Sequence, residues 1–191
     1  MVGGNSLDAS TRYMAASVAR RHMTVATHDF CFEYSAGVYV DGWGNPEVVT
    51  TVGQTHDWLQ GTNPDDGQAA SGKVSLIGIS MGATAALNYA LSLGENASDQ
   101  IASIALISPA LDTEDIEGTP RDAFLQASLR YAYGGSAATF AVEGVLHNPM
   151  RLRSEIAAMR IPIHIWYSSD DPIALTAITE SFIETTDYVR G

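Results

Sequence analysis

The stretch VSLIGISMGATAALNYAL at residues 74–91 constrains the fold most, because it changes from one kind of secondary structure to another around a single serine. The residues before Ser80 are mostly apolar and β-branched, which favours a buried strand. The residues after it are rich in alanine and leucine, which favours a helix. Gly78 and Gly82 stand two places before and after the serine, as a sharp strand-to-helix turn requires. The stretch therefore predicts a strand that leads directly into a packed helix.

Two further apolar runs follow along the chain, IASIALISPA at 101–110 and IPIHIWYSS at 161–169. A helical pattern at 83–93 separates the first of them from the run at 73–79. Continuous apolar strands joined by helices are typical of a parallel sheet whose two faces are covered. The sequence therefore predicts an α/β fold with a mostly parallel sheet and helices on both faces.

The first part of the chain has weaker patterns. Residues 7–22 place apolar side chains at mostly helical spacing and end in a cluster of positive side chains, which suits a helix C-terminus. We expect the next segments to be a short strand (23–28), a loop (31–46), a helix (47–60) and an exposed linker (61–72).

The length of 191 residues suits one domain with a substantial core, so we expect a single α/β domain over 1–191. Between the last two apolar runs lies an insertion, 112–158, that is longer than a crossover helix requires. It contains the helical patterns DAFLQASLRYAY and RLRSEIAAMR. An insertion of this size beyond the strand ends predicts a cap or lid, and an ordinary pair of packing helices is the alternative.

The charge of the chain narrows the classes of partner. With 22 acidic residues against 10 lysines and arginines, the net charge is -12 at pH 7, which disfavours binding to nucleic acid or anionic lipid. No apolar run approaches the roughly 18 residues of a membrane span, and residues 1–20 lack a signal-peptide pattern. We therefore expect no membrane span and, by default, a cytoplasmic protein.

Cys31 is the single cysteine in the sequence. It has no partner for an internal disulfide, and a cysteine-based zinc site is excluded. No pair of histidines has the spacing of a metal site. We expect neither a metal nor a cofactor.

A serine between two glycines at such a turn has a chemical use. The turn holds the serine in a strained backbone conformation and exposes its hydroxyl, so Ser80 is a candidate nucleophile. The N–H of Met81 then lies at the N-terminus of the helix, where it is a candidate donor to an oxyanion. A small residue in a tight turn, without chemistry, is the alternative.

With this turn, GISMGA at 78–83, the chain resembles the α/β-hydrolase superfamily, and its esterases and lipases in particular. The resemblance extends over nearly the whole length. It implies a serine hydrolase that cleaves small-molecule carboxylic esters through a seryl acyl-enzyme, without a cofactor. Dehalogenases and epoxide hydrolases of the same fold need aspartate at this turn, so Ser80 argues against them.

The resemblance also implies a catalytic acid. The family's acid loop resembles G-x-x-D-x-x-V, which corresponds here to SSDDPIA at 168–174 and aligns the acid with Asp171. Asp170 is the neighbouring candidate. Asp112 follows the preceding strand, where some relatives keep their acid. A solvated turn carboxylate or a helix cap is the alternative for each.

The opening VGGNS at 2–6 resembles part of the family's glycine-rich oxyanion loop. This likeness places the second oxyanion donor at Gly4 or Asn5, and a flexible N-terminus is the alternative. Apolar residues of the cap could line a pocket for an acyl or aromatic group, or form the core of the cap. They are Phe124, Leu125, Leu129, Tyr131 and Phe140.

The family places its catalytic histidine after the last strand, and no histidine follows Asp171 in this sequence. Three explanations are open. The chain is a piece of a longer hydrolase, or a truncated homologue that binds ligands or partners. In the family a central strand precedes the oxyanion loop, and residues 1–5 leave no room for it, so the expected partners include a homo-oligomer or another segment that supplies the missing strands. Alternatively, another histidine substitutes. The candidates are His147 in the cap and His28 after a strand end, ahead of His56 and His164.

Overall fold

The structure is a computed structural model, and it describes residues 16–17, 31–34, 38–61, 72–119, 122–186 and 189–190. The predicted strand at 23–28 lies outside the described residues, as does most of the predicted helix at 7–22. The described residues form a mixed α/β fold, which confirms the predicted class.

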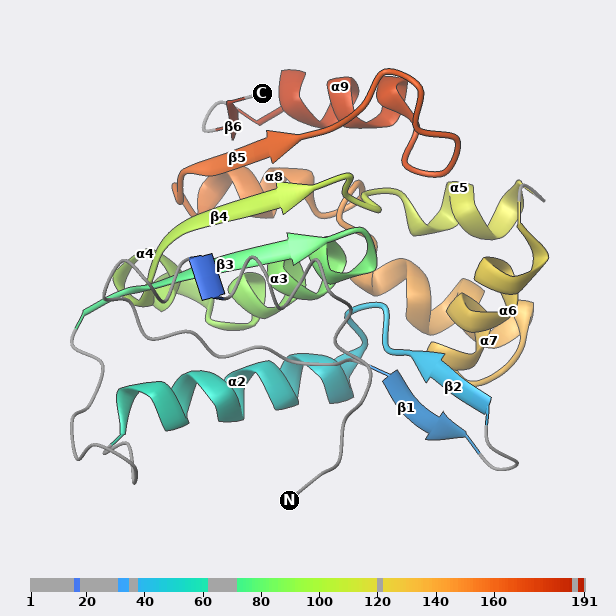
Figure 1. The fold of residues 1–191 in the computed structure, drawn as a ribbon, viewed down its shortest axis with the longest axis horizontal. Helices are drawn as coiled ribbons and strands as arrows, with labels where there is room; N and C mark the ends of the chain where they lie inside the picture. The colour runs from blue at the N-terminus through green and yellow to red at the C-terminus, as the bar shows by residue number, and fades with distance from the viewer. Residues whose placement is uncertain are drawn as a thin grey trace.

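The main sheet has four parallel strands in the order β3-β4-β5-β6 (Figure 1). The three apolar runs of the sequence supply β3 (Val74–Ile79), β4 (Ile101–Ile107) and β5 (Ile163–Trp166). The edge strand β6 (Val189–Arg190) is short. Because the strands are parallel, their carboxyl ends meet at one edge of the sheet.

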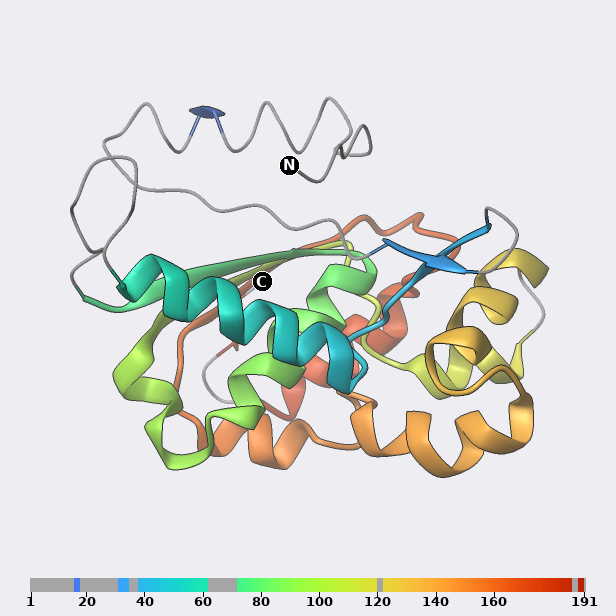
Figure 2. The same ribbon diagram turned by 90° about the horizontal axis from the view of Figure 1, so that it is seen from below.

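One face of this sheet is the main core. In register across the strands, Leu76, Ile104 and Ile163 form one row, and Gly78, Leu106 and Ile165 form the next. The helices that pack on this face are α2 (Pro46–Gln60), α3 (Met81–Ser92), α8 (Arg153–Ala158) and α9 (Thr176–Glu184). Figure 2 shows that they lie on one side of the sheet.

The opposite face carries the alternate side chains. Ile77, Ala105 and His164 form one row across the strands, and Ile79, Ile107 and Trp166 form the next. We call these six residues the open face, because no described helix packs on them. Ile77 is 49% exposed and Trp166 is 57% exposed. The sequence predicts helices on both faces of the sheet, and the described helices cover one of them.

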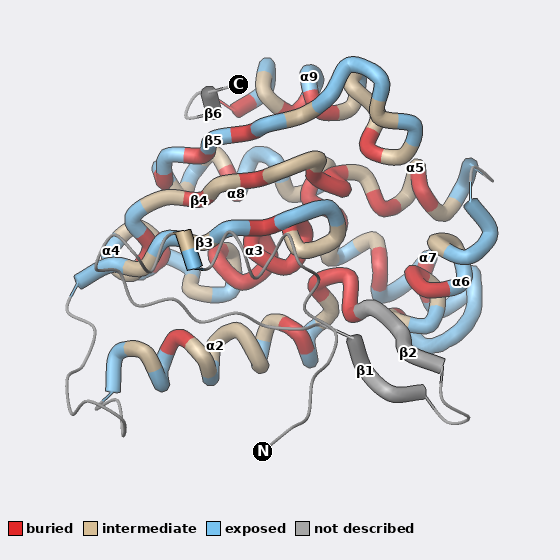
Figure 3. The backbone as a smooth tube through the Cα atoms, in the orientation of Figure 1, coloured by how far each residue is buried: buried red, intermediate tan, exposed pale blue. Residues whose placement is uncertain are grey.

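Helix α3 runs through the middle of the helical layer, and residues 83–90 are all buried (Figure 3). Small side chains such as Ala83, Ala86 and Ala90 let its backbone approach the sheet closely. Helix α2 packs beside it and begins with Pro46, after Asn45, whose side chain accepts a hydrogen bond from the N–H of Val48. These contacts fix the direction of α3, the helix that follows Ser80.

The segment before α2 is a β-hairpin rather than the predicted loop. Strands β1 (Cys31–Tyr34) and β2 (Val38–Asp41) pair antiparallel. A turn with positive φ at Trp43 and Gly44 then leads to α2. A Cβ on Gly44 would lie 2.9 Å from the backbone nitrogen of Ala85, so this turn rests directly on α3. The sequence did not predict this hairpin, because the glycine-rich composition of the segment favours turns over strands.

The remaining elements lie between the strands. After α3 come the short helices η1 (Gly94–Asn96) and α4 (Ala97–Gln100). After β4 come α5 (Thr113–Gly118), α6 (Ala123–Ala132), α7 (Ala137–Glu143) and η2 (Gly144–His147). In Figure 1 these last four gather beyond the carboxyl ends of the strands. Among the described helices, none has the length and apolar character that crossing a membrane requires.

The apolar residues of α6 and α7 form a second, smaller core. Leu129, Tyr133 and Phe140 pack with Trp43 from the turn before α2 and with other residues of the insertion. Ile156 of α8, although it belongs to the insertion, packs in the main core instead. The insertion therefore divides between a separate helical cluster (α5 to η2) and the layer on the sheet.

Candidate functional site

The turn at Ser80 joins β3 to α3 with a backbone conformation that is rare for a residue with a side chain. Ser80 has φ 52° and ψ -118°, and such a conformation costs roughly 1–3 kcal/mol. Three hydrogen bonds hold it in place. The Ser80 N–H donates to the carbonyl of Ile107, and the Ser80 carbonyl accepts from the N–H groups of Ala83 and Ala110. The side chain is exposed.

The two glycines of the turn have different roles. A Cβ on Gly78 would lie 2.6 Å from the Cα of Ala83 and 2.6 Å from the carbonyl oxygen of Gly82, so this position excludes any side chain. A Cβ on Gly82 would meet no atom of the described residues within 4 Å. The expectation that both positions must lack bulk thus holds, within the described part, for Gly78 only.

The first turn of α3 is anchored to the end of β4 and to the helical cluster α5 to η2, which we call the cap cluster after the expectation from the sequence. The Thr84 hydroxyl donates to the carbonyl of Ala110 at 2.6 Å and is fully buried. Met81, the first residue of the helix, packs its side chain against the core of α6 and α7. Its N–H is one of the helix's first four donors, which lack an intrahelical partner. The insertion therefore adjoins the Ser80 turn.

Asp171 lies in the loop after β5, at the same edge of the sheet as Ser80. Its Oδ1 accepts hydrogen bonds from the N–H groups of Ile173 and Ala174, both at 2.9 Å. The side chain is half-buried, whereas the neighbouring Asp170 is exposed. Because β5 is two strands from β3, the loops that carry Asp171 and Ser80 leave strands separated by about 10 Å. No described hydrogen bond joins the two side chains directly.

Asp112 has a structural role in the described residues. It caps α5 by accepting from the N–H groups of Glu114 and Asp115, and it accepts a third bond from the side-chain amide of Asn148. Asn148 is 1% exposed. The side-chain carbonyl oxygen of Asn148 in turn accepts a hydrogen bond from the N–H of Thr113. The carboxylate of Asp112 therefore connects the start of α5 to the end of η2.

His147 lies against Tyr133 of the core formed by α6 and α7. Its ring stacks on Tyr133 with centroids 5.8 Å apart, and its carbonyl accepts from the side-chain amide of Asn88 at 2.9 Å. Asn88 is eight residues beyond Ser80, which corresponds to about 12 Å along a helix. Burial lowers the pKa of His147, although the charge of Glu143 opposes the shift.

His56 and His164 are also placed apart from Ser80. The Nδ1 of His56 lies 2.5 Å from the Tyr89 hydroxyl between α2 and α3, and burial lowers its pKa while Asp57 opposes the shift. His164, which alternation along the strand suggested for the core, is exposed on the open face and stacks on Trp166. His28, Gly4 and Asn5 lie outside the described residues. The structure thus brings none of the three described histidines to Ser80.

The apolar residues suggested for a substrate pocket divide into two groups. Leu129 and Phe140 are buried in the cap core, and Leu125 packs against it. Phe124 is 65% exposed and Tyr131 is 44% exposed. The first group therefore forms the core of the cap cluster.

Sequence reasoning did not single out Ser108 or Trp43, although both adjoin the site. Ser108 follows β4 with φ 42°, and its N–H donates to the carbonyl of Trp166 at 2.7 Å. It stands between the strand ends that carry Ser80 and Asp171. The Trp43 indole N–H donates to the Ser128 hydroxyl at 2.8 Å. No local signal in the sequence indicated this conformation of Ser108, because a residue before proline is expected to be extended.

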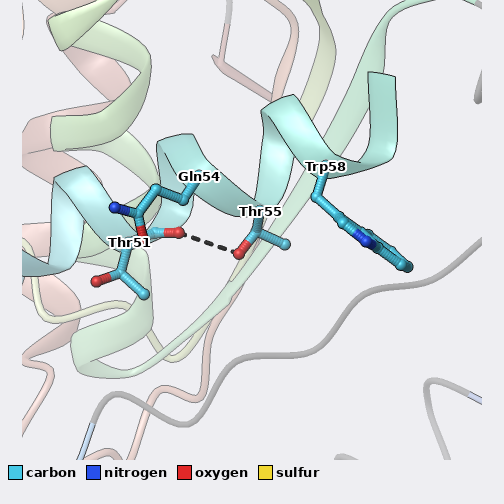
Figure 4. Close-up of a pocket in the computed structure, with 4 residues that line it drawn as sticks. All are labelled: Thr51, Gln54, Thr55 and Trp58. Atoms are coloured by element: carbon cyan, nitrogen blue, oxygen red, sulfur yellow. Dashed lines mark hydrogen bonds between the residues drawn. The ribbon is translucent and has the colours of Figure 1, made fainter. Parts of the chain in front are cut away.

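Two hollows in the described surface lie away from Ser80. One, of about 250 Å³, is lined by Thr51, Gln54, Thr55 and Trp58 on the outer side of α2 (Figure 4). A larger one, of about 900 Å³, lies between α2, α3, η2 and α8 and includes Asn88 and His147. Neither hollow is lined by Ser80 or Asp171. The candidate site is therefore defined by the residues at the carboxyl ends of the parallel strands. No cluster of three or more potential metal-binding side chains occurs among the described residues.

No protein-family model matches the chain, and no curated protein matches it by sequence. Solved structures are similar to parts of it. A monoacylglycerol lipase from Paleococcus ferrophilus has 16% identity and a TM-score of 0.49, over 75% of this chain and 62% of that one. A lipase-esterase related protein from Clostridium acetobutylicum has 15% identity and a TM-score of 0.42, over 74% and 64% respectively.

A serine hydrolase involved in carbazole degradation, CarC, has 18% identity and a TM-score of 0.44, over 87% of this chain and 64% of that one. The chain thus spans less than two thirds of the length of each of these three proteins. The described residues have an α/β fold in which the parallel strands are ordered β3-β4-β5-β6 and a serine with positive φ stands between β3 and α3.

Proposed function

We propose that this chain carries the nucleophile and the acid of a serine hydrolase that acts on carboxylic esters. The observation that carries the proposal is the conformation of Ser80. An exposed serine at φ 52°, locked by three backbone hydrogen bonds at the carboxyl edge of a parallel sheet, places a hydroxyl where a substrate can reach it. A structural turn would favour glycine at this φ, because glycine adopts it without strain.

In the proposed reaction, Ser80 Oγ bonds to the carbonyl carbon of the ester while its proton passes to a histidine. The carbonyl oxygen becomes an oxyanion, which the Met81 N–H at the start of α3 stabilises. A second donor comes from Gly4 or Asn5. The alcohol leaves with the proton from the histidine, and water then hydrolyses the acyl-enzyme by the same steps.

Asp171 is the proposed acid. Two backbone N–H groups hold its Oδ1, which fixes the orientation of the carboxylate without a charged partner. The Oδ2 atom is then available to an imidazole N–H. A separation of two strands between Ser80 and Asp171 is too long for direct contact and leaves room for an imidazole between them. Asp112 is a poorer choice, because its Oδ1 already accepts three hydrogen bonds.

The base belongs to a part of the protein outside the described residues. His56, His147 and His164 have contacts elsewhere, to Tyr89, Tyr133 and Trp166 respectively. The cap cluster, which contacts Met81, is the proposed wall of the substrate site. The substrate is a small-molecule ester, and Phe124 and Tyr131 of α6 are exposed apolar side chains that could contact an acyl group.

Hydrolysis of a p-nitrophenyl ester tests this proposal on the protein expressed from its complete natural reading frame. Ser80→Ala should lower kcat/KM by about 10³-fold or more, because the acyl-enzyme no longer forms. Asp171→Asn should lower it by about 10²–10⁴-fold through the wrong histidine tautomer. The matched variant Asp170→Asn should stay within about twofold of the wild type. Equal losses for the two aspartate variants would contradict the assignment of the acid.

A second candidate function is a catalytically incomplete protein that uses the hydrolase fold to bind ligands or partners. The observation in its favour is that none of the three described histidines contacts Ser80. On this account, Ser80→Ala would leave the basal rate of ester hydrolysis unchanged in the complete protein. The same kinetic comparison therefore separates the two functions.

A further inference from the structure

The turn at Trp43 and Gly44, between β2 and α2, is a strained segment to which the proposed function assigns no role. Trp43 has φ 47° and Gly44 has φ 69°. Trp43 is also buried, with 2% of its surface exposed. A left-handed conformation is uncommon for a residue as bulky as tryptophan, and it persists only where the surroundings hold it. The bonds of this turn therefore indicate what it positions.

Three hydrogen bonds join the turn to α6 and to the residue after α6. The indole N–H of Trp43 donates to Ser128 Oγ at 2.8 Å, and the Tyr133 hydroxyl donates to the carbonyl of Trp43 at 2.9 Å. The side-chain amide of Asn45 donates to the carbonyl of Ala132 at 2.9 Å. Trp43, Ser128 and Tyr133 are all buried, so loss of a partner would leave a buried polar group without a hydrogen bond. The turn and α6 therefore hold a fixed relative position.

The other side of the turn rests on α3. A Cβ on Gly44 would lie 2.9 Å from the backbone nitrogen of Ala85, and the carbonyl of Gly44 accepts a hydrogen bond from the side-chain amide of Asn88 at 3.0 Å. Trp43 belongs to the same apolar core as Met81, the first residue of α3. The turn thus connects α6 of the cap cluster to the helix that begins at the candidate nucleophile.

We infer that Trp43 is a positioning residue that sets where the cap cluster stands relative to Ser80, and that it thereby determines which acyl groups the substrate site accepts. The inference rests on the proposed function, in which the cap cluster is a wall of that site. Trp43 acts through α6, to which its buried indole is bonded at Ser128. A shift of α6 moves the wall and leaves the three backbone hydrogen bonds of Ser80 in place. Substrate preference therefore depends on Trp43, and the reactivity of the Ser80 hydroxyl does not.

Trp43→Phe tests the inference in the protein expressed from its complete natural reading frame, with p-nitrophenyl acetate and p-nitrophenyl octanoate as substrates. Phenylalanine keeps most of the apolar bulk and loses the N–H donor, so α6 is held less closely. The ratio of kcat/KM for octanoate to kcat/KM for acetate should change by about fivefold or more, mainly through KM for octanoate. The rate at which diisopropyl fluorophosphate labels Ser80 should stay within about twofold. The matched variant Trp58→Phe, at an exposed position of α2, should leave the ratio unchanged.

Ser128→Ala is a second variant that removes the acceptor of the same bond and keeps the indole. It should change the ratio in the same direction as Trp43→Phe, and the double variant should differ little from either, since both changes remove one interaction. Far-UV circular dichroism reports whether each variant keeps the fold.

Two results with folded variants would overturn the inference. One is an unchanged ratio in both Trp43→Phe and Ser128→Ala, and the other is an equal loss of kcat/KM for the two esters together with slower labelling of Ser80. A wild-type protein without Ser80-dependent hydrolysis would instead overturn the proposed function, and the inference with it.

Discussion

At the scale of single residues, unusual backbone conformations gather where the parallel strands end. Ser80 directly follows β3 with φ 52°, and Ser108 directly follows β4 with φ 42°. Both are tied into neighbouring strands, since the N–H of Ser80 donates to Ile107 and the N–H of Ser108 donates to Trp166. Hydrogen bonds to neighbouring strands hold both strained serines at one edge of the sheet. Strained residues that are held in this way are typical of functional sites.

The two glycines beside Ser80 provide a matched test of this turn. Gly78→Ala should lower the free energy of unfolding by about 1–3 kcal/mol, because a Cβ 2.6 Å from the backbone of α3 forces the helix away from the strand. Gly82→Ala should be neutral or raise it by up to about 1 kcal/mol, since alanine favours the helix. Urea unfolding curves of the two variants check the prediction, and equal destabilisation would contradict the described geometry.

The sequence predicts some of these residues and not others, for physical reasons. The pattern G-x-S-x-G identifies Ser80 because steric requirements of the turn act on neighbouring positions. The choice of Asp171 over Asp170 rests on a resemblance. The bonds from the N–H groups of Ile173 and Ala174 are those of a turn carboxylate, so they do not distinguish a catalytic role from a structural one. The role of Asp112 as a cap depends on Asn148, 36 residues away, which no local pattern reveals.

At the scale of elements, the apolar runs predicted β3, β4 and β5 correctly, because strands of a parallel sheet are continuous in hydrophobicity. The hairpin β1-β2 was missed, since its glycine and aromatic residues do not alternate like a half-buried strand. His164 was expected in the core because alternation assigns a side chain to a face and does not say whether that face is covered. The sequence left open whether the apolar residues of α6 and α7 line a pocket or form a core. Those that are buried pack with Trp43 and form a core.

The contact between α2 and α3 predicts a pH dependence of stability. Burial holds the pKa of His56 below its ordinary value of 6.5, and the neutral ring pairs with the Tyr89 hydroxyl. Because the unfolded chain binds the proton more readily, stability is complete above about pH 6.5 and is lost as the pH falls toward the lower folded pKa. The pKa of His147 is lowered in the same direction.

Urea midpoints measured from pH 7.5 to pH 5 should therefore fall in the wild type, and they should fall less in His56→Gln, which retains a polar partner for Tyr89. The fall in the urea midpoint that remains in His56→Gln includes the contribution of His147. Identical pH profiles for the two proteins would show that the His56 contact does not titrate on folding.

At the scale of the whole molecule, the described residues form a parallel sheet with helices packed on one of its two faces. Helices α2, α3, α8 and α9 cover one face of the sheet, and no described helix covers the other face. Ser80 and Asp171 of the candidate site stand at the carboxyl edge of the sheet, and the proposed second oxyanion donors Gly4 and Asn5 lie outside the described residues.

The central claim, that Ser80 is shaped as a nucleophile, is tested most directly by covalent modification with a fluorophosphonate, followed by peptide mass spectrometry. In the complete protein, we predict a single adduct on the peptide that contains Ser80, lost in Ser80→Ala and retained in the matched Ser108→Ala. Absence of an adduct, or an adduct that persists in Ser80→Ala, would contradict the claim.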